Sequence, residues 1–490
     1  MTAFVEWMNQ SGLWGEIILV GDLLVRVALV IGILGRRRTS PEVRIGWIML
    51  LLAVPIFGTV VYLLIGDTRL GARRIRRHRR IIDALDRPEV HASGDPDAVA
   101  YGALAGSDRH LARLAELISG SLPVRGNEIE LFGDSDEVHD RMEADIDAAT
   151  EHCHFLFYIW LDDAAGSRIG HALIRAAARG VQCRVLVDSV GSKAFLKSRL
   201  CADMRAGGVD VREAMPANAI RLLFARIDLR NHRKIAVIDR ELAWTGSQNM
   251  AEASFAPKPK YAPWVDCAIR LVGPVAKELH LLFVEDWYMD SDESLVELLH
   301  EPVEPRDRGV ITQVVASGPN FLNEAATQLI QSCIHEANEE LTLTTPYFVP
   351  DAATIVNLAT AARRGIDVTI VVPHRNDSKL VGLASRSNYA PLLSAGVKIL
   401  EFNGGLLHAK TITVDRRISL VTSCNLDRRS FDLNFEAGVI VYDENFSRKL
   451  RFLQQSYMER ATRVDLDAWL ERPWRTRLAE NAAGLLSPLL

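Results

Sequence analysis

The chain has 490 residues, a length that allows about three domains. Its 57 basic and 62 acidic residues give a net charge of −5, and this near balance argues against a protein whose main partner is a nucleic-acid backbone. None of the six cysteines lies in a C-x2-C pair, and no nucleotide-binding motif is present, so we expect free thiols and neither a metal nor a cofactor.

Two hydrophobic segments near the N-terminus predict a transmembrane helical hairpin over residues 1–68. The segment from Leu13 to Leu34 is mostly apolar but contains three ionisable residues, which are costly at membrane depth. An interfacial or partly inserted helix is the alternative for this segment. The segment from Ile45 to Ile65 carries no charge, contains Pro55, and has the length needed to cross a bilayer.

Arginines gather on both sides of the second hydrophobic segment. Those before it are Arg36, Arg37, Arg38 and Arg44, and those after it are Arg69, Arg73, Arg74, Arg76, Arg77, Arg79 and Arg80. If both segments span, the two clusters lie on opposite sides, and the larger one is expected to keep the rest of the chain in the cytoplasm. The larger cluster is interpreted either as a contact with anionic lipids or as a plain stop-transfer anchor.

After a basic and helical linker over residues 69–125, the chain shows two similar halves, 126–305 and 306–490. The elements expected in the first half are a strand from His154 to Trp160, a helix from Arg168 to Arg179 and a strand from Val181 to Val187. Those expected in the second are a strand from Leu341 to Thr345, a helix from Asp351 to Arg364 and a strand from Ile366 to Val372. This alternation predicts an α/β sheet fold in each half.

One motif occurs twice, with a shift of 176 residues, and reads H-x-K-x4-D-x6-(G/T)-S-x-N. The first copy contains His232, Lys234, Asp239, Ser247 and Asn249, and the second contains His408, Lys410, Asp415, Ser423 and Asn425. Because the duplication keeps both copies in register, we expect the halves to pack about a pseudo-twofold axis, with the motifs meeting at the interface. This double signature resembles the phospholipase D superfamily.

The residue types of the motif suit chemistry on a phosphodiester. Lys234 and Lys410 would attract the phosphate, and the Ser and Asn side chains would donate hydrogen bonds to its oxygens. One histidine would attack phosphorus while the other protonates the leaving alcohol and then deprotonates the incoming one. Asp239 and Asp415 follow apolar runs, so we interpret them as structural braces rather than proton carriers.

Each imidazole also needs an acceptor for its second nitrogen. In the superfamily a carboxylate follows the motif at about the spacing of Glu436, which implies that Glu436 orients a histidine. Asp266 is the nearest match in the first half, although its spacing differs and a solvated strand end is the alternative.

Further stretches are similar to bacterial cardiolipin synthases of the phospholipase D type. They are Thr344 to Pro350, Arg375 to Ser378, Gly404 to His408 and Asn425 to Phe431, besides the N-terminal hairpin. The resemblance implies transfer of a phosphatidyl group between two phosphatidylglycerol molecules, with cardiolipin and glycerol as products. It also implies that His232 is the nucleophile and His408 the acid/base, an order that the nearly symmetric sequence leaves open.

The resemblance further implies a multi-pass protein of the bacterial cytoplasmic membrane, with its halves on the cytoplasmic side. Anionic membrane lipids, and no nucleic acid, are the expected partners. Arg221 to Arg230 would touch lipid headgroups or form a strand with a basic outer face, and Trp469 to Leu490 would lie on the membrane or pack on the hairpin. Arg375 is a candidate headgroup contact or a solvated loop charge.

Three alternative functions are weighed against the interpretation as a phosphatidyltransferase that makes cardiolipin. A phospholipase D-type hydrolase, or a phosphatidyltransferase that makes another lipid, would use the same motif chemistry with another acceptor. A nucleic-acid phosphodiesterase would be basic and would lack the hairpin. A non-catalytic lipid-binding protein would be expected to have lost a motif residue.

Overall fold

The computed structural model describes residues 13–35, 41–54, 56–66, 72–85, 90–91, 99–216, 226, 228–321 and 324–487. The chain forms two compact units, one of residues 1–72 and 217–228 and the other of residues 73–216 and 229–490. Several predictions concern residues outside the described ranges, namely Arg36 to Arg38, Arg69, Arg221 to Ala225, Leu489 and Leu490.

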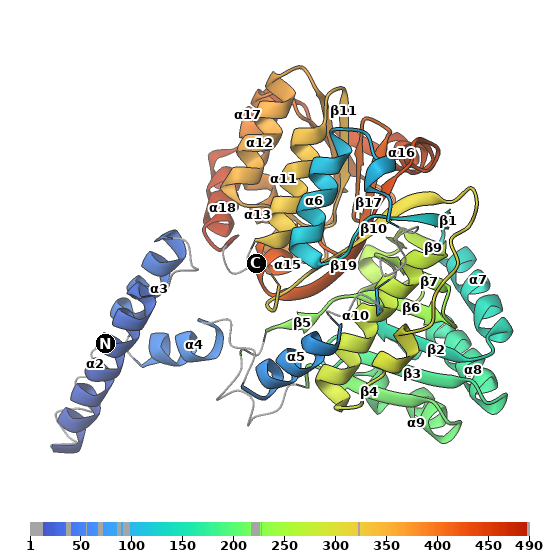
Figure 1. Ribbon diagram of the computed structural model, residues 1–490. Coiled ribbons are helices and arrows are strands. Elements are labelled where there is room, and N and C mark those ends of the chain that lie inside the picture. The colour runs from blue at the N-terminus through green and yellow to red at the C-terminus, as the bar shows by residue number, and fades with distance from the viewer. Residues whose placement is uncertain are drawn as a thin grey trace. The chain divides into compact units, whose positions relative to one another are not determined.

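The described part of the N-terminal unit contains three helices, α2 (Leu13–Leu34), α3 (Pro41–Ala53) and α4 (Phe57–Ile65) (Figure 1). The expected single helix from Ile45 to Ile65 is therefore wrong, because the chain leaves the helical conformation between α3 and α4. The sequence has Pro55 at this point, and proline interrupts the hydrogen-bond ladder of a helix. Within the described ranges, no helix is both long enough and apolar enough to cross a bilayer, so the hairpin of two uninterrupted spans is not found.

Sixteen strands of the described chain form one continuous sheet in the larger unit. The first half contributes β1 (Val124–Phe132), β2 (His152–Phe157), β3 (Gln182–Asp188), β4 (Asp210–Ala214), β5 (Arg230–Asn231), β6 (Lys234–Ile238), β7 (Leu242–Gly246) and β9 (Ala268–Val272). The second half contributes β10 (Val310–Ser317), β11 (Glu340–Thr344), β13 (Asp367–Pro373), β14 (Lys398–Phe402), β16 (Thr411–Val414), β17 (Ile418–Thr422), β19 (Asn434–Tyr442) and β20 (Ala461–Arg463). Four two-residue strands pair outside it as β12 (Phe348–Val349) with β18 (Leu426–Asp427), and β15 (Leu406–Leu407) with β8 (Trp264–Val265).

The strand order shows the internal twofold relation expected from the repeated motif. Outward from β1 the order is β9-β7-β6-β2-β3-β4, and outward from β10 it is β19-β17-β16-β11-β13-β14, with β20 at the edge. The two halves join where β1 and β10 pair antiparallel. The prediction of a mixed α/β fold with two similar halves is confirmed.

Helices cover both faces of this sheet. Those of the first half and its approach are α5 (Ala72–Leu85), α6 (Asp108–Ser119), α7 (Ser135–Ala148), α8 (Ala164–Ala178), α9 (Arg199–Ala206) and α10 (Pro274–Ser291). Those of the second half are α11 (Ala325–Glu336), α12 (Ala352–Arg363), α13 (Lys379–Ser387), α14 (Tyr389–Ser394), α15 (Arg428–Asp432), α16 (Glu444–Glu459), α17 (Leu466–Leu470) and α18 (Trp474–Gly484). Short 3-10 helices are η3 (Tyr101–Ala103), η4 (Phe195–Lys197), η6 (Pro259–Tyr261) and η7 (Val296–Leu299).

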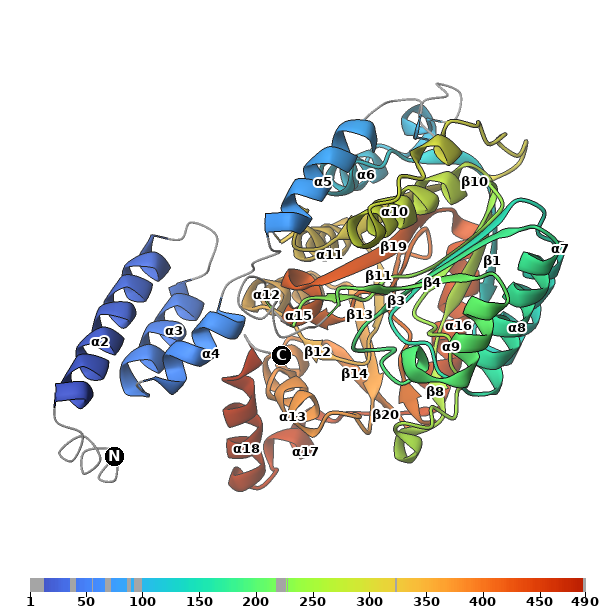
Figure 2. The ribbon, with the colours of Figure 1, turned by 90° about the horizontal axis from the view of Figure 1, so that it is seen from below.

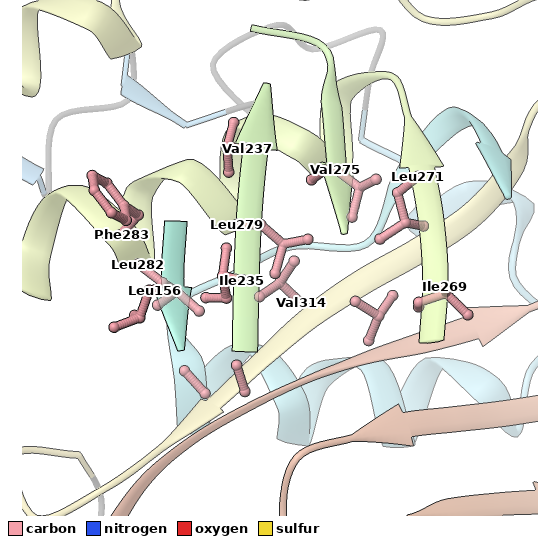
Figure 3. Packing of buried hydrophobic residues seen from close by; sticks show 14 of the residues in the cluster. Leu156, Ile235, Val237, Ile269, Leu271, Val275, Leu279, Leu282, Phe283 and Val314 are labelled. Carbon is pink, nitrogen blue, oxygen red and sulfur yellow. The ribbon is translucent and has the colours of Figure 1, made fainter. Parts of the chain in front are cut away.

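One hydrophobic core is shared by the two halves, because α10 and α16 both contribute to it. Figure 3 shows Val275, Leu279, Leu282 and Phe283 of α10 beside Leu156, Ile235, Val237, Ile269 and Leu271 of the first half and Val314 of β10. Separate clusters lie under α7 to α9 and under α6, α11 and α12. Burial on both faces explains why the central strands are almost continuously apolar.

In the two halves, the predicted helices and strands are found with their ends shifted by a few residues. The helix expected from Arg168 to Arg179 is α8, and the one expected from Asp351 to Arg364 is α12. Each is followed by a glycine, Gly180 or Gly365, with φ of +94°. This left-handed conformation ends a helix at little cost only for glycine.

Candidate active site

Each motif histidine follows a two-residue strand that pairs with the opposite half. β5 pairs with β19, and β15 pairs with β8. The backbone N–H of His232 donates to the carbonyl of Phe435 at 2.9 Å, and that of His408 donates to the carbonyl of Val265 at 2.7 Å. The interface between the halves therefore positions both histidine backbones.

The carboxylates expected to orient the histidines are also exchanged between the halves. Nδ1 of His232 lies 2.9 Å from Oε2 of Glu436, and Nδ1 of His408 lies 2.7 Å from Oδ1 of Asp266. All four side chains are buried. Each carboxylate follows directly after the residue whose carbonyl holds the partner histidine, so one short stretch of backbone fixes both the main chain and the ring.

Burial sets the protonation of these pairs. It lowers the pKa of His232 to about 4 and lowers the pKa of His408, because a charged imidazole loses its hydration in the interior. Burial alone would raise the pKa of Glu436 and Asp266, but the neighbouring histidines and lysines outweigh it, and both pKa values are lowered. The free site therefore holds neutral imidazoles that donate Nδ1–H to carboxylates, which leaves each Nε2 with a lone pair.

The two motif lysines are buried and lie over their own histidines. Nζ of Lys234 donates to the carbonyl of His232 at 2.7 Å, and Nζ of Lys410 donates to that of His408 at 2.6 Å. Burial lowers the pKa of Lys234 to about 7 and that of Lys410 to about 8. An arriving phosphodiester would supply the negative charge that these lysines lack, which suits the predicted anion site.

Aromatic rings lie against both histidines. The ring of Tyr158 lies 4.7 Å from that of His232 and 5.4 Å from Nζ of Lys234, and the ring of Trp264 lies 4.7 Å from that of His408. Neither aromatic residue was predicted as part of the site. Their positions directly after β2 and next to Asp266 are the signals in the sequence that could have indicated them.

The two motif serines bind the carboxylates. The hydroxyl of Ser247 donates to Asp266 at 2.5 Å and accepts the N–H of Cys267 at 2.9 Å. The hydroxyl of Ser423 donates to Glu436 at 2.5 Å and accepts a backbone N–H in the same way. Because both hydroxyl protons are engaged, this arrangement favours a role in holding the carboxylates over the predicted contact with phosphate.

Each motif asparagine has one side-chain polar atom without a hydrogen-bond partner among the described residues. Oδ1 of Asn249 accepts the N–H of Ile159 at 3.3 Å, while its buried Nδ2 has no hydrogen-bond partner among the described residues. Nδ2 of Asn425 donates to Ser430 at 3.1 Å, and its Oδ1 has no partner in that part of the chain. An unused buried donor costs free energy, so Nδ2 of Asn249 suits contact with a substrate oxygen.

Asp239 and Asp415 lie at the opposite ends of β6 and β16 from the histidines. Each carboxylate accepts three consecutive backbone N–H groups at 2.8–3.2 Å, those of Thr150, Glu151 and His152 or those of Asn338, Glu339 and Glu340. Both aspartates have positive φ, 51° and 49°. This geometry supports the interpretation of both aspartates as structural braces. They belong to the same motif as the histidines and lysines, but they do not lie with them in the site.

Arg233 lies between the first motif histidine and lysine and turns to the other side of the strand. It is fully buried, pairs with Asp286 of α10 at 2.7 Å, and donates through Nε to the carbonyl of Glu436 at 3.2 Å. Sequence reasoning did not identify this anchor. The acidic residues Glu285 and Asp286 among the buried positions of α10 were an indication in the sequence.

One buried group of histidines lies apart from the site, formed by His152, His154 and His280. Nδ1 of His154 lies 2.8 Å from Nε2 of His280, the rings of His152 and His154 stack at 4.5 Å, and the guanidinium of Arg184 lies 3.3 Å from His154. Stacked neutral rings beside a cation fit interior packing better than metal binding.

The chain and its fold match known proteins. The family model described as "Cardiolipin synthase, PLD-like domain" matches residues 142–287 and 330–455, and that described as "Phospholipase_D-nuclease N-terminal" matches residues 23–66. The class is thus that of phospholipase D-like enzymes. The crystal structure of phosphatidylserine synthase from Haemophilus influenzae Rd KW20 has the same fold, with a TM-score of 0.59 at 16% identity over 79% of this chain and 100% of that chain.

Relatives that match over the full length of the chain identify its family within this class of enzymes. The chain is 35% identical to cardiolipin synthase A of Edwardsiella ictaluri over 497 residues, 99% of both chains. It is 36% identical to cardiolipin synthase A of Salmonella arizonae over 500 residues, 100% of both. The chain therefore belongs to the cardiolipin synthase family of phospholipase D-like proteins.

Proposed function

We propose that the protein is a cardiolipin synthase, a phosphatidyltransferase that joins two phosphatidylglycerol molecules and releases glycerol. The observation that carries the mechanism is the crossed arrangement of the two histidine–carboxylate pairs. It presents two equivalent neutral imidazoles, each held in one tautomer, beside two buried lysines. Two such groups are what a two-step displacement at phosphorus needs.

In the first step Nε2 of His232 attacks the phosphorus of the donor lipid, and the bond to the glycerol headgroup breaks. His408 gives its proton to the departing glycerol oxygen. The negative charge of the bound phosphodiester favours the protonated form of His408 and opposes the burial that lowers its pKa. In the second step His408 takes the proton of the acceptor hydroxyl, whose oxygen attacks phosphorus and releases His232.

Lys234, Lys410 and Asn249 stabilise the phosphate oxygens during both steps. The lysines supply charge in a buried site, where an electrostatic contact is stronger than in water. Ser247 and Ser423 keep the carboxylates in place. The pKa of about 4 for His232 supports its role as the nucleophile, because a nucleophile must be unprotonated at neutral pH.

The enzyme acts at the bacterial cytoplasmic membrane, with its two halves on the cytoplasmic side. Within the N-terminal unit, exposed apolar side chains such as Leu24, Ile31 and Phe57 support contact with lipid. Insertion of this unit as a multi-pass hairpin remains our prediction. Protease protection of a tag at either end of the chain in sealed inner-membrane vesicles tests it.

A lipid assay on the purified full-length protein tests the function. Wild type, His232→Ala and His408→Ala are given phosphatidylglycerol as the only phospholipid in mixed micelles, without divalent metal. We expect cardiolipin and free glycerol from wild type and neither from the variants. Phosphatidic acid without cardiolipin would mean that water is the acceptor and that the protein is a hydrolase.

The same variants test the order of the histidines. A phosphatidyl adduct trapped in His408→Ala but absent from His232→Ala identifies His232 as the nucleophile. The reverse pattern would exchange the two roles.

A further inference from the structure

A cavity of about 600 Å³ lies beside the catalytic centre and is lined by basic side chains. It is formed by the loop that follows β13, the first turns of α13 and the η6 turn of the first half. Its basic lining residues are Lys260, His374, Arg375, Lys379 and Arg386.

The cavity holds more positive charge than its own carboxylates neutralise. His374 and Arg386 share one carboxylate, that of Glu401, at 2.8 Å and 3.1 Å. Arg375, Lys379 and Lys260 form no ion pair with any residue in the described part of the chain. Unpaired cations in a concave site attract an anion, and guanidinium and ammonium groups are well suited to phosphate.

Asp377 connects this cavity electrostatically to the catalytic site. It follows the lining residue Asn376 in the sequence, and it accepts from the hydroxyl of Tyr347 at 2.8 Å and from Nζ of Lys258 at 2.6 Å. The charge of Asp377 also raises the pKa of Lys410, although less than burial lowers it. Asn376, which lines the cavity, donates to the carbonyl of Pro346 at 2.8 Å and ties the two loops together.

The surface near the cavity is apolar. Leu380 of α13 is 39% exposed. α18 packs on α13 through Ala483 and Ala384, and the two helices lie side by side in Figures 1 and 2. Trp474 and Leu478 of α18, and Leu485 directly after it, are exposed at helical spacing, with Leu485 82% exposed. Apolar side chains beside a cationic cavity suit a lipid, whose headgroup enters while its chains remain at the surface.

We propose that this cavity binds the phosphate of the acceptor phosphatidylglycerol. This assignment rests on the proposed function, in which the acceptor keeps its own phosphodiester while its terminal glycerol hydroxyl attacks the phosphohistidine. The hydroxyl oxygen forms the new bond to phosphorus, the bond from phosphorus to His232 breaks, and His408 takes the proton. The acceptor phosphate is unchanged in the product, so it needs a cationic site distinct from the one that holds the reacting phosphorus.

Exchange of labelled glycerol into phosphatidylglycerol separates the two sites, because glycerol is an acceptor without a phosphate. We compare wild type with the double variant Arg375→Ala/Lys379→Ala at limiting phosphatidylglycerol. We expect cardiolipin formation to fall about tenfold or more, as when a charge-assisted contact is removed, while glycerol exchange stays within about twofold of wild type. The charge-retaining variant Arg375→Lys/Lys379→Arg should recover most of the cardiolipin formation.

Arg199→Ala is the matched control, because it removes a cation that is 92% exposed on α9 in the first half, and it should change neither reaction. An equal loss of cardiolipin formation and glycerol exchange in the double variant would overturn the proposal, since the cavity would then serve the donor or act as a general lipid contact. Unchanged cardiolipin formation would overturn it as well. Failure of the proposed function is distinguishable, because wild type would then give neither cardiolipin nor labelled phosphatidylglycerol.

Discussion

At the scale of single residues, the site consists of two equivalent clusters, each built from both halves. Glu436 receives hydrogen bonds from the ring of His232 and from the hydroxyl of Ser423, so it joins the two motifs. Asp266 does the same for His408 and Ser247. Each carboxylate therefore controls the tautomer of a histidine that belongs to the other half.

Replacement of the carboxylates tests this control. We expect Glu436→Gln to lower the rate of phosphatidyl transfer by about 100-fold, because an amide no longer fixes the Nδ1–H tautomer that leaves Nε2 free. Asp266→Asn should slow both formation and resolution of the adduct, because His408 gives a proton in the first step and takes one in the second. Quenched-flow measurement of the adduct separates the two steps, and a wild-type rate in Glu436→Gln would contradict the assignment.

The pH dependence of kcat/KM follows from the groups of the free enzyme. Below a pH of about 4, His232 becomes protonated and loses its lone pair, so the rate should fall on the acid side. As the pH rises through about 7 to 8, Lys234 and Lys410 lose the charge that attracts phosphate, so the rate should fall again. Lys234 has the lower pKa and loses its charge first. Lys234→Arg keeps that charge at high pH, and an alkaline limb that does not move upward in this variant would refute the explanation.

At the scale of elements, Asp239 and Asp415 connect neighbouring strands at the ends of β6 and β16 that lie away from the histidines. They do so by accepting the backbone N–H groups that begin β2 and β11.

A second contact between elements holds α5 against α10. Arg74 pairs with Asp290 at 2.8 Å with both side chains buried, and Arg77 donates to the carbonyl of Met289.

Asp239→Ala should affect stability rather than chemistry. Loss of the acceptor for three N–H groups should lower the free energy of unfolding by about 1–2 kcal/mol, since these groups are partly solvated. We expect the folded fraction to keep a kcat close to wild type. Denaturant unfolding together with active-site titration measures both, and a large fall in kcat per folded molecule would instead place Asp239 in the catalytic machinery.

The arginines of α5 should divide into two functional groups. Arg74→Ala should lower stability by about 3 kcal/mol, because Asp290 would remain buried without its partner. The exposed Arg76, Arg79 and Arg80 are free to meet anionic lipid. Replacing these three by Gln should weaken binding to anionic vesicles at unchanged stability, as shown by co-sedimentation beside thermal unfolding. Equal behaviour of the two variants would contradict the division.

At the scale of the whole molecule, the halves form one cooperative structure. One core contains side chains from both, and each histidine is held by backbone and carboxylate from the other half. The β1–β10 pair makes the sheet continuous across the junction. Each half has a hydrophobic cluster of its own, but neither has a complete site by itself.

A chain that ends at residue 305 tests this dependence. It would expose the edge of β1 and leave His232 without Glu436, so we expect it to aggregate or to unfold at lower denaturant, and to form no adduct. Co-expression with residues 306–490 should restore adduct formation if the halves assemble. Adduct formation by the first half alone would show that the crossed arrangement is dispensable.

The sequence by itself determined the repeat, the α/β class and the family, and it predicted the catalytic residue types and Glu436 and Asp266 as the partners of the histidines. These inferences depend on local periodicity and on the register of the duplication, which can be read along the chain without the fold. The hydrogen bonds of Asp239 and Asp415 support their interpretation as braces, which was made from their positions after apolar runs. The break within residues 45–65 was missed because the apolar composition outweighed the signal of Pro55.

Only the tertiary structure decided which carboxylate serves which histidine, where the serine protons go, and which arginines of α5 are buried. These depend on contacts between residues up to 216 positions apart, as for Arg74 and Asp290, and no local pattern encodes them. The basic cavity beside Asp377 also depends on contacts between segments that are distant in the sequence. Its cations are scattered through three loops and helices, and only their convergence around one space makes them a site.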